Sequence, residues 1–473
     1  MTANPRQHGF GLERASLLAA LLRYGLALAY AILLCVIYRY LSDFWTYLGF
    51  RWSDPNYAQL GLVCLAAAAP SLVLPIRVNS LFAFFGWSLH YLLFIPATII
   101  PYLQGFEARG SIAVLVLVVV ATAVGFGLAS RMRLAPFPPL EISSRTMMTG
   151  LFWVFLAGQF YVLIKFRDTL SFAGADDIYE QRSRFSAGLT DNYDAYLLLT
   201  LSNAINPFVL ALGLYRRSWW LAGAGAGGQV LAYSTLALKS ILLSPVLIVA
   251  VYLLFDSSGR FRPGLFSLSL VLLSLIAVPL MPNYQPGNSL FDDILSLIFF
   301  RTLYIGGALT GIYSDFFSIY PWTYFSYSSI GRIFTEYPYG ALSIGQAVGL
   351  HVVPTNSYEL LELNASFLAT DGIGSLGKGG VIVILPVVIG VFWVLSRASA
   401  AVPKRIVFPA TVPFLITVTN TSILSSLLSG GGMVLGLLFY LLGSAQLTEA
   451  RKRRETQVAR AREKKASMDQ APA

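Results

Sequence analysis

The sequence has little charge and almost no cysteine or histidine. Charged residues make up 12% of its 473 residues, about half of what a soluble domain carries. The two cysteines, Cys35 and Cys64, both lie in apolar runs, which argues against a disulfide framework or a thiolate metal site. The HExxH, GxSxG and GxxxxGK[ST] patterns do not occur. Zinc-protease, serine-hydrolase and P-loop chemistry are therefore not indicated.

What the chain does contain is long apolar runs. Apolar residues make up 56% of it, and the mean hydropathy is +0.67. A window of about 19 residues finds about twelve runs able to cross a bilayer as helices. The sequence therefore predicts an all-α integral membrane protein with about 12 transmembrane helices. The expected cores are 17–38, 57–76, 79–100, 111–130, 146–165, 195–215, 220–238, 241–255, 265–281, 379–396, 406–424 and 430–446.

The distribution of Lys and Arg between alternate connections predicts the orientation. One set of connections is basic, short and nearly free of acids, and it includes both ends of the chain. Because such connections stay inside, both termini are expected in the cytoplasm. We expect one membrane domain over 1–446, with large periplasmic loops at 166–194 and 282–378, and a basic cytoplasmic tail over 447–473. The tail holds eight Lys or Arg between 451 and 465, which favours contact with anionic lipid and gives no reason to expect nucleic-acid binding.

Basic residues are rare in the connections predicted to be periplasmic. Arg182 and Arg184 follow an acidic cluster in the loop 166–194, and Arg301 and Arg332 lie in the loop 282–378. A guanidinium suits bidentate binding of phosphate, so these arginines are candidates to hold a diphosphate, although each could instead pair with a nearby carboxylate. Lys239 stands alone between two apolar runs, where a cation either has a function or reaches to the interface.

His351 is the only histidine in a predicted periplasmic loop. Imidazole titrates near neutral pH, so this residue is the first candidate for a general base, with a structural role as the alternative. The carboxylates Glu336, Glu359, Glu362 and Asp371 compete for the same role. No pattern of metal ligands is present, and we expect no metal and no cofactor.

Three elements carry a resemblance to a known family. They are the Tyr-x-x-Arg element Tyr179–Arg182, the segment with Arg301, Tyr304 and Tyr313–Phe317, and the glycine-rich stretch Asn364–Gly380. Together with the large third and fifth outer loops, they resemble the O-antigen and exopolysaccharide repeat-unit polymerases. The resemblance implies a glycosyltransferase, with a GT-C-like architecture, that joins undecaprenyl-diphosphate-linked oligosaccharides on the periplasmic face and releases undecaprenyl diphosphate.

The resemblance also implies roles for individual residues. Arg301, His351 and Asp371 would be catalytic, and the substrate-binding residues would be Tyr179, Arg182, Arg184, Lys239, Tyr304, Arg332, Glu336 and Asn364. Partners would be the lipid-linked glycans, the bilayer and a chain-length-regulating co-polymerase. No cofactor is needed, because the glycosyl-diphosphate bond already carries the energy. An O-antigen ligase, or another polyprenyl-phosphate-dependent glycosyltransferase, is the first alternative, and a flippase or transporter for lipid-linked oligosaccharides is the second.

Overall fold

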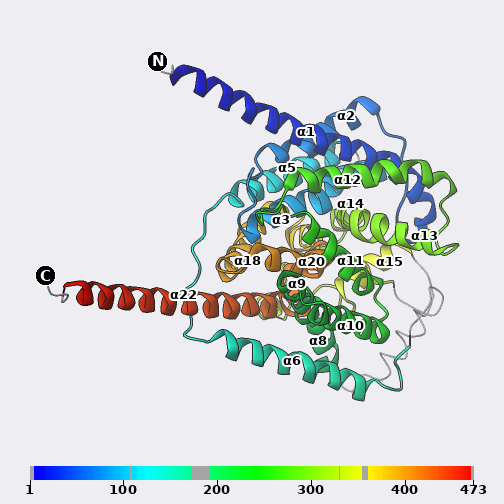
Figure 1. Ribbon diagram of the computed structural model, residues 1–473. Helices are drawn as coiled ribbons and strands as arrows, with labels where there is room; N and C mark the ends of the chain where they lie inside the picture. The colour runs from blue at the N-terminus through cyan, green and yellow to red at the C-terminus, as the bar shows by residue number, and fades with distance from the viewer. Residues whose placement is uncertain (1–4, 107–108, 172–191, 330, 354–360, 470–473) are drawn as a thin grey trace.

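The computed structural model describes residues 5–106, 109–171, 192–329, 331–353 and 361–469, and within these ranges the chain is built from helices (Figure 1). Nine of the described helices are long and apolar enough to cross a membrane. The prediction of an all-α membrane protein is therefore confirmed. These helices are Leu17–Phe44, Leu81–Gln104, Ser111–Ala129, Ser144–Lys165, Tyr193–Arg216, Pro263–Asn283, Phe291–Ile319, Gly380–Ala398 and Gly432–Arg460.

Local signals in the sequence explain where several helices begin. The side chains of Asn56, Ser80 and Ser143 each accept a hydrogen bond from a backbone N–H group in the first turn of the following helix. In the first half of the chain the helices are α1 (Pro5–Phe44), α2 (Tyr57–Ala68), α3 (Leu81–Leu89), α4 (Ile95–Gln104), α5 (Arg109–Ala129), α6 (Ser144–Lys165), α8 (Asn192–Thr200), α9 (Asn206–Arg216), α10 (Trp219–Leu236) and α11 (Lys239–Leu253).

The second half has shorter pieces, and several long helices are interrupted. The helices are α12 (Pro263–Ala277), α13 (Leu290–Leu295), α14 (Ile305–Ile319), α15 (Ile344–Val352), α16 (Gly374–Leu376), α17 (Gly380–Val383), α18 (Leu385–Ala398), α19 (Lys404–Ala410), α20 (Val412–Asn420), α21 (Ile423–Leu428) and α22 (Gly432–Asp469). Wider π-helical turns join some neighbours into one continuous element, as they do at His90–Phe94, Leu201–Ile205 and Ser296–Tyr304.

The structure differs from the predicted twelve spans. Eight predicted runs coincide with long helices, but 57–76 and 241–255 form the shorter helices Tyr57–Leu72 and Lys239–Leu253. The run 406–424 is divided into α19 and α20 at Thr411, and 220–238 forms α10, which is outside the nine. The ninth long helix, Phe291–Ile319, lies inside 282–378. The segment predicted to be a large loop therefore contains a long apolar helix.

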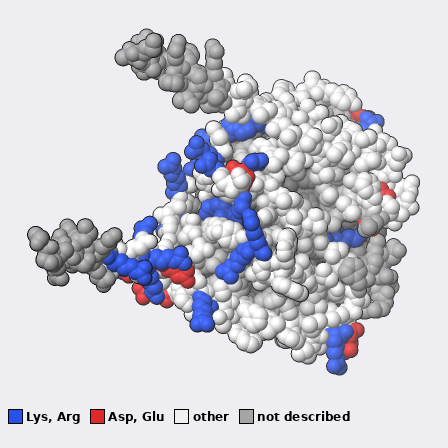
Figure 2. Space-filling model, in the orientation of Figure 1, with Lys and Arg blue, Asp and Glu red and all other residues white. Residues whose placement is uncertain are grey.

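One end of the bundle carries both chain termini, and we call it the terminal end. The N-terminal part of α1 and the C-terminal part of α22 extend from the same side of the molecule (Figure 1). Lys and Arg gather on this side in the view of Figure 2. Arginine side chains here hold connections together by donating to their backbone carbonyls. These bonds run from Arg23 to Leu74, from Arg131 to Val73, from Arg397 to Ala135 and from Arg405 to Asp256.

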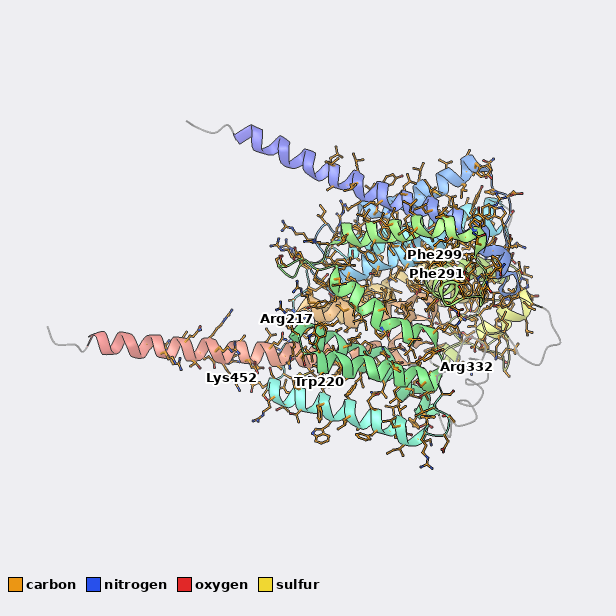
Figure 3. The ribbon with its side chains drawn as sticks, turned by 45° about the vertical axis from the view of Figure 1, so that its right-hand side comes forward. Arg217, Trp220, Phe291, Phe299, Arg332 and Lys452 are labelled. Carbon is orange, nitrogen blue, oxygen red and sulfur yellow. The ribbon has the colours of Figure 1, made fainter. Side chains whose placement is uncertain are left out.

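The other connections meet at the opposite end, which we call the loop end. The α1–α2 connection is bonded to the end of α4, through Ser53 N–H and Leu103 O at 2.8 Å. The segment after α6 is bonded to the end of α10, and the segment after α12 packs Tyr284 against Phe44 at the end of α1. Figure 3 shows Phe291 and Arg332 on this side and Arg217 and Lys452 toward the terminal end. The alternation of basic and mixed connections thus corresponds to two physical ends of the bundle.

Both halves of the helix Phe291–Ile319 make contacts at the loop end. Phe300 stacks on Trp45 with ring centroids 4.0 Å apart, and Asp315 lies beside Arg51 in a cavity described below. Trp45 and Arg51 belong to the same connection, between α1 and α2. Between the two halves, the Tyr304 hydroxyl donates to the Leu34 carbonyl, farther inside α1. These contacts indicate a helix that enters the bundle and remains at the loop end, instead of joining the two ends.

The packing of α14 against α4 positions this element. Gly311 faces the last turn of α4, where an added Cβ would lie 2.1 Å from the Oε1 atom of Gln104. The amide of Gln104 is the movable end of a side chain, but Gly307, one turn earlier on α14, meets backbone. An added Cβ there would lie 2.6 Å from the carbonyl carbon and oxygen of Pro96, so the two helices approach as closely as backbones allow. Asp315 lies two turns after Gly307 on the same helix. The contact at Gly307 therefore sets where Asp315 stands.

Candidate functional site

A cavity of about 460 Å³ opens at the loop end between segments that are far apart in the sequence. Its volume is in the range of small-molecule sites. The α1–α2 connection, the turn after α4, α14 and α15 all contribute to it. The lining residues are Thr46, Gly49, Phe50, Arg51, Phe106, Asp315, His351 and Val352.

His351 and Asp315 form a pair in this cavity. The Nε2 atom of His351 lies 3.2 Å from the Oδ2 atom of Asp315, and the two side chains are 24% and 18% exposed. Phe316 and Tyr320 flank the imidazole edge-to-face, with ring centroids 5.5 and 5.7 Å from it. When Nε2 carries the proton and donates it to Asp315, the Nδ1 atom is a proton acceptor. The pair thus has the arrangement of a histidine base oriented by a carboxylate.

Arg51 supplies positive charge to the same cavity. Its Nε atom donates to the Gln104 carbonyl at 2.7 Å, and its guanidinium lies 3.5 Å from the centroid of the Phe106 ring. These two contacts fix the plane of the guanidinium, which is the condition for bidentate binding of an anion. Gly49, at φ +83°, forms the turn before it, and an added Cβ would lie 2.8 Å from a methyl group of Val352. The turn that carries Arg51 therefore packs directly against α15.

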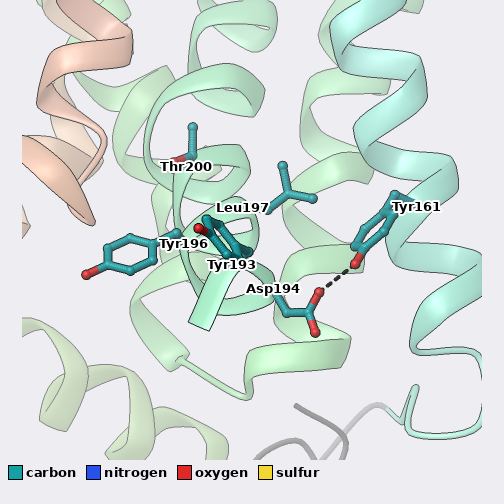
Figure 4. A pocket seen from close by; sticks show the side chains of 6 residues that line it. All are labelled: Tyr161, Tyr193, Asp194, Tyr196, Leu197 and Thr200. Carbon is teal, nitrogen blue, oxygen red and sulfur yellow. Dashed lines mark hydrogen bonds between the residues drawn. The ribbon is translucent and has the colours of Figure 1, made fainter. Parts of the chain in front are cut away.

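A second cavity, of about 330 Å³, lies between α6 and α8 (Figure 4). Tyrosine side chains and one buried carboxylate dominate its lining. The Tyr161 hydroxyl donates to the Oδ1 atom of Asp194 at 2.5 Å, and the Nζ atom of Lys165 lies 3.8 Å from Oδ2. The lining residues are Tyr161, Tyr193, Asp194, Tyr196, Leu197 and Thr200.

Of the residues predicted from the sequence, His351 lines the first cavity. Lys239 instead pairs with Asp293, at 3.3 Å between Nζ and Oδ1, and joins α11 to α13. Arg332 donates from Nε to the Ser326 carbonyl, and its guanidinium lies 5.3 Å from the Tyr337 ring centroid. Both cations are thus engaged by neighbouring groups of the chain at the loop end.

Arg301, Glu336 and Asn364 are exposed in the structure. The guanidinium of Arg301 lies 5.4 Å from the ring centroid of its neighbour Phe300, on the π-helical part of Phe291–Ile319. Tyr304 is fully buried and donates to the Leu34 carbonyl, so the structure places it in the core of the bundle. A role of these four residues in the functional site stays a prediction.

Asp371 is buried at the junction of three segments. The Tyr327 hydroxyl donates to its Oδ1 atom, and the backbone N–H of Ile423 donates to Oδ2 at 2.7 Å. Burial raises the pKa of this carboxyl to about 7, and the two hydrogen bonds offset only part of that effect. The geometry indicates a residue that ties the loop 320–329 and the start of α21 to the segment before α16. Asp371 is absent from the lining of both cavities.

Tyr179, Arg182 and Arg184 lie outside the described residues. Sequence reasoning also missed two residues of the first cavity, Arg51 and Asp315. Arg51 was not among the predicted site residues, although Arg39 and Arg51 are the two basic residues between the first two apolar runs. Asp315 stands in the aromatic stretch Tyr-Ser-Asp-Phe-Phe, where a lone carboxylate among apolar residues was an available signal.

Comparisons with protein-family models, curated proteins and solved structures found no match for the chain.

Proposed function

We propose that this chain is a bacterial inner-membrane glycosyltransferase that polymerises undecaprenyl-diphosphate-linked oligosaccharide repeat units at the loop end, on the periplasmic face. The observation that carries the proposal is the cavity in which the Asp315–His351 pair and the guanidinium of Arg51 stand together. A base and an anion-binding group are the two requirements of glycosyl transfer from a diphosphate. The resemblance of the three sequence elements described above names the substrate class.

The chemistry requires one bond to form and one to break. A hydroxyl oxygen of the acceptor unit attacks the anomeric carbon of the donor, and the bond between that carbon and the diphosphate oxygen breaks. The Nδ1 atom of His351 accepts the hydroxyl proton, while Asp315 holds Nε2–H and stabilises the imidazolium that forms. Undecaprenyl diphosphate leaves as an anion beside Arg51. Holding both reactants in line contributes about 7–11 kcal/mol to lowering the barrier.

The position of the cavity suits a lipid-linked substrate. It opens at one end of a bundle of apolar helices, where a diphosphate would lie at the membrane surface with its lipid chain alongside. The basic terminal end would face the cytoplasm, as its Lys and Arg favour. Nucleotide sugars and ATP would not reach the loop end, and the reaction needs neither.

The test uses purified protein in bilayer nanodiscs with a single lipid-linked repeat unit as the only glycan. Products of two or more repeats are the expected result. Transfer that occurs only after a lipid A core is added would make the protein a ligase. Movement of the lipid-linked unit across a vesicle without any transfer would make it a transporter. In cells, a deletion strain should accumulate one repeat unit on its lipid carrier, measured by mass spectrometry.

A further inference from the structure

The cavity between α6 and α8 has a composition that the proposed reaction chemistry does not use. Asp194 is 3% exposed and lies at the start of one long apolar helix, and its partner Lys165 ends another. A carboxylate among apolar helices is costly to bury and, when present, usually has a function. An ion pair that served only to join α6 to α8 would need no cavity beside it.

The tyrosines around this carboxylate come from two helices. Tyr161 projects from α6 toward Asp194, whereas Tyr193 and Tyr196 stand on α8 (Figure 4). The last two are 81% and 51% exposed, so their rings present apolar faces and hydroxyl groups outward. Flat aromatic faces beside hydrogen-bonding groups match the two kinds of surface on a sugar ring, its C–H face and its hydroxyls.

We infer that the cavity between α6 and α8 binds a neutral pyranose ring, with tyrosine faces against its C–H groups and Asp194 accepting from its hydroxyls. A carboxylate accepts up to about four hydrogen bonds, so Asp194 can accept from a sugar hydroxyl in addition to its contacts with Tyr161 and Lys165. The volume of the cavity, about 330 Å³, corresponds to one or two sugar rings more readily than to a long oligosaccharide.

The cavity lies at the loop end, as the reaction cavity does. The segment that follows α6 is bonded to the end of α10, through Ser171 N–H and Ser234 O at 3.2 Å, and Lys239 at the start of α11 pairs with Asp293 of α13. The site would therefore hold a sugar of the acceptor repeat unit on the same face as the transfer step. That assignment of the ligand rests on the proposed function, whereas binding of a sugar ring does not.

The test is binding of the detergent-solubilised full chain, fluorescently labelled, to an array of bacterial surface oligosaccharides. Wild type should be retained on a subset of the glycans. Tyr193→Ala and Tyr196→Ala should each weaken that binding by roughly two- to tenfold, the usual worth of an aromatic contact. Tyr193→Phe keeps the ring and should retain most of the affinity. Asp194→Asn should weaken binding and leave the helix pair folded, as thermal unfolding would show.

The matched control is Tyr57→Ala, because Tyr57 is 71% exposed on α2 at the loop end and lies outside both cavities. Equal weakening by Tyr57→Ala would mean that the tyrosines act as membrane-interface residues, and would overturn the site. Retention of no glycan by wild type would overturn it as well. Glycan binding in a protein that fails to elongate a lipid-linked repeat would keep this site and remove the proposed function.

Discussion

The two ends of the bundle use charged side chains in different ways. At the terminal end, arginines donate to backbone carbonyls of neighbouring connections, as Arg131 does to Val73 and Arg397 to Ala135. At the loop end, three basic groups stand opposite carboxylates, in the pairs His351–Asp315, Lys165–Asp194 and Lys239–Asp293, while Arg332 donates to the Ser326 carbonyl. Two of these three pairs border a cavity. The loop end is therefore where pairs of opposite charge lie next to a cavity.

Charged side chains that border a cavity are better candidates for function in this bundle than those that fasten its connections. A guanidinium that caps carbonyls has its donors directed into the protein, and its loss affects stability. A base and a carboxylate that pair with each other beside a cavity can act on a ligand, because neither of them is bonded to the backbone of a neighbouring connection. Arg51 does both, since one of its nitrogens is bonded to the Gln104 carbonyl at the rim of the reaction cavity.

The largest effect is expected in a test of which compartment each end of the bundle faces. Reporter fusions at Gly340 and at the tail should give opposite, all-or-none compartment signals, and a fusion at Gly259 should agree with the tail. The reason is that α12 leads to the loop end and that Phe291–Ile319 stays there. A fusion at Gly340 that reports the same compartment as the tail would mean that this helix crosses the membrane.

The second prediction concerns turnover. His351→Gln and Asp315→Asn should each lower elongation of lipid-linked repeats by about 100-fold or more, the usual contribution of a general base. The control is Asp168→Asn, which removes a carboxylate from an exposed pair with Arg167 at the loop end. Normal turnover in His351→Gln would transfer the role of the base to a carboxylate.

The third prediction separates charge from geometry at Arg51. Arg51→Ala should raise the KM for the lipid-linked donor by roughly tenfold to a hundredfold, because a hydrogen bond between charged groups is lost. Arg51→Lys keeps the charge without the planar fork and should recover only part of the loss. Arg301→Ala is the comparison, because the sequence assigned the diphosphate to that exposed residue. A loss of polymer in Arg301→Ala alone would place the diphosphate there and away from the cavity.

The smallest effect is expected at Asp371. Burial raises the pKa of its carboxyl to about 7 in the folded protein, from an ordinary value of 3.8. The folded state thus binds more protons between these values, so stability is fully supported below about pH 4 and declines as the pH rises through about 7. Thermal unfolding in detergent should show a melting temperature that falls between pH 5 and pH 8. Asp371→Asn should reduce that slope, and an unchanged slope would contradict the assignment.

Much of the fold could be predicted from hydropathy and charge. Long apolar runs such as 111–130 became long helices, and both termini lie on the side where Lys and Arg gather (Figures 1 and 2). The helix Phe291–Ile319 was not among the predicted spans, although its apolar window has a mean hydropathy of 1.5, against 1.4 for Gly432–Arg460. The charges of Asp292, Asp293 and Arg301 concealed a signal that the sequence contains. The tertiary contacts of this helix, such as the pairing of Asp293 with Lys239, accommodate those charges, and a hydropathy window contains no such information.

The site was less predictable than the fold. His351 was a candidate because of its chemistry alone, and the structure places it in a cavity. Its neighbours there, Arg51 and Asp315, come from other parts of the chain, and nothing in the local pattern brings them together. Asp371 was also a candidate, because it is a carboxylate in a glycine-rich stretch. In the structure its two oxygens accept hydrogen bonds from Tyr327 and from the backbone of Ile423.

The close contact at Gly307 sets the spacing of the groups in the reaction cavity. Gly307 lines neither cavity, yet any side chain there would meet the backbone of Pro96 and push α14 away from α4. Asp315, two turns farther along, would move with the helix and lose its distance to His351, while Arg51 would stay with the Gln104 carbonyl. A glycine with no chemistry of its own therefore keeps the reacting groups at their distance. Substitutions at this glycine should therefore abolish activity without affecting membrane insertion, as substitutions at the charged residues of the cavity should.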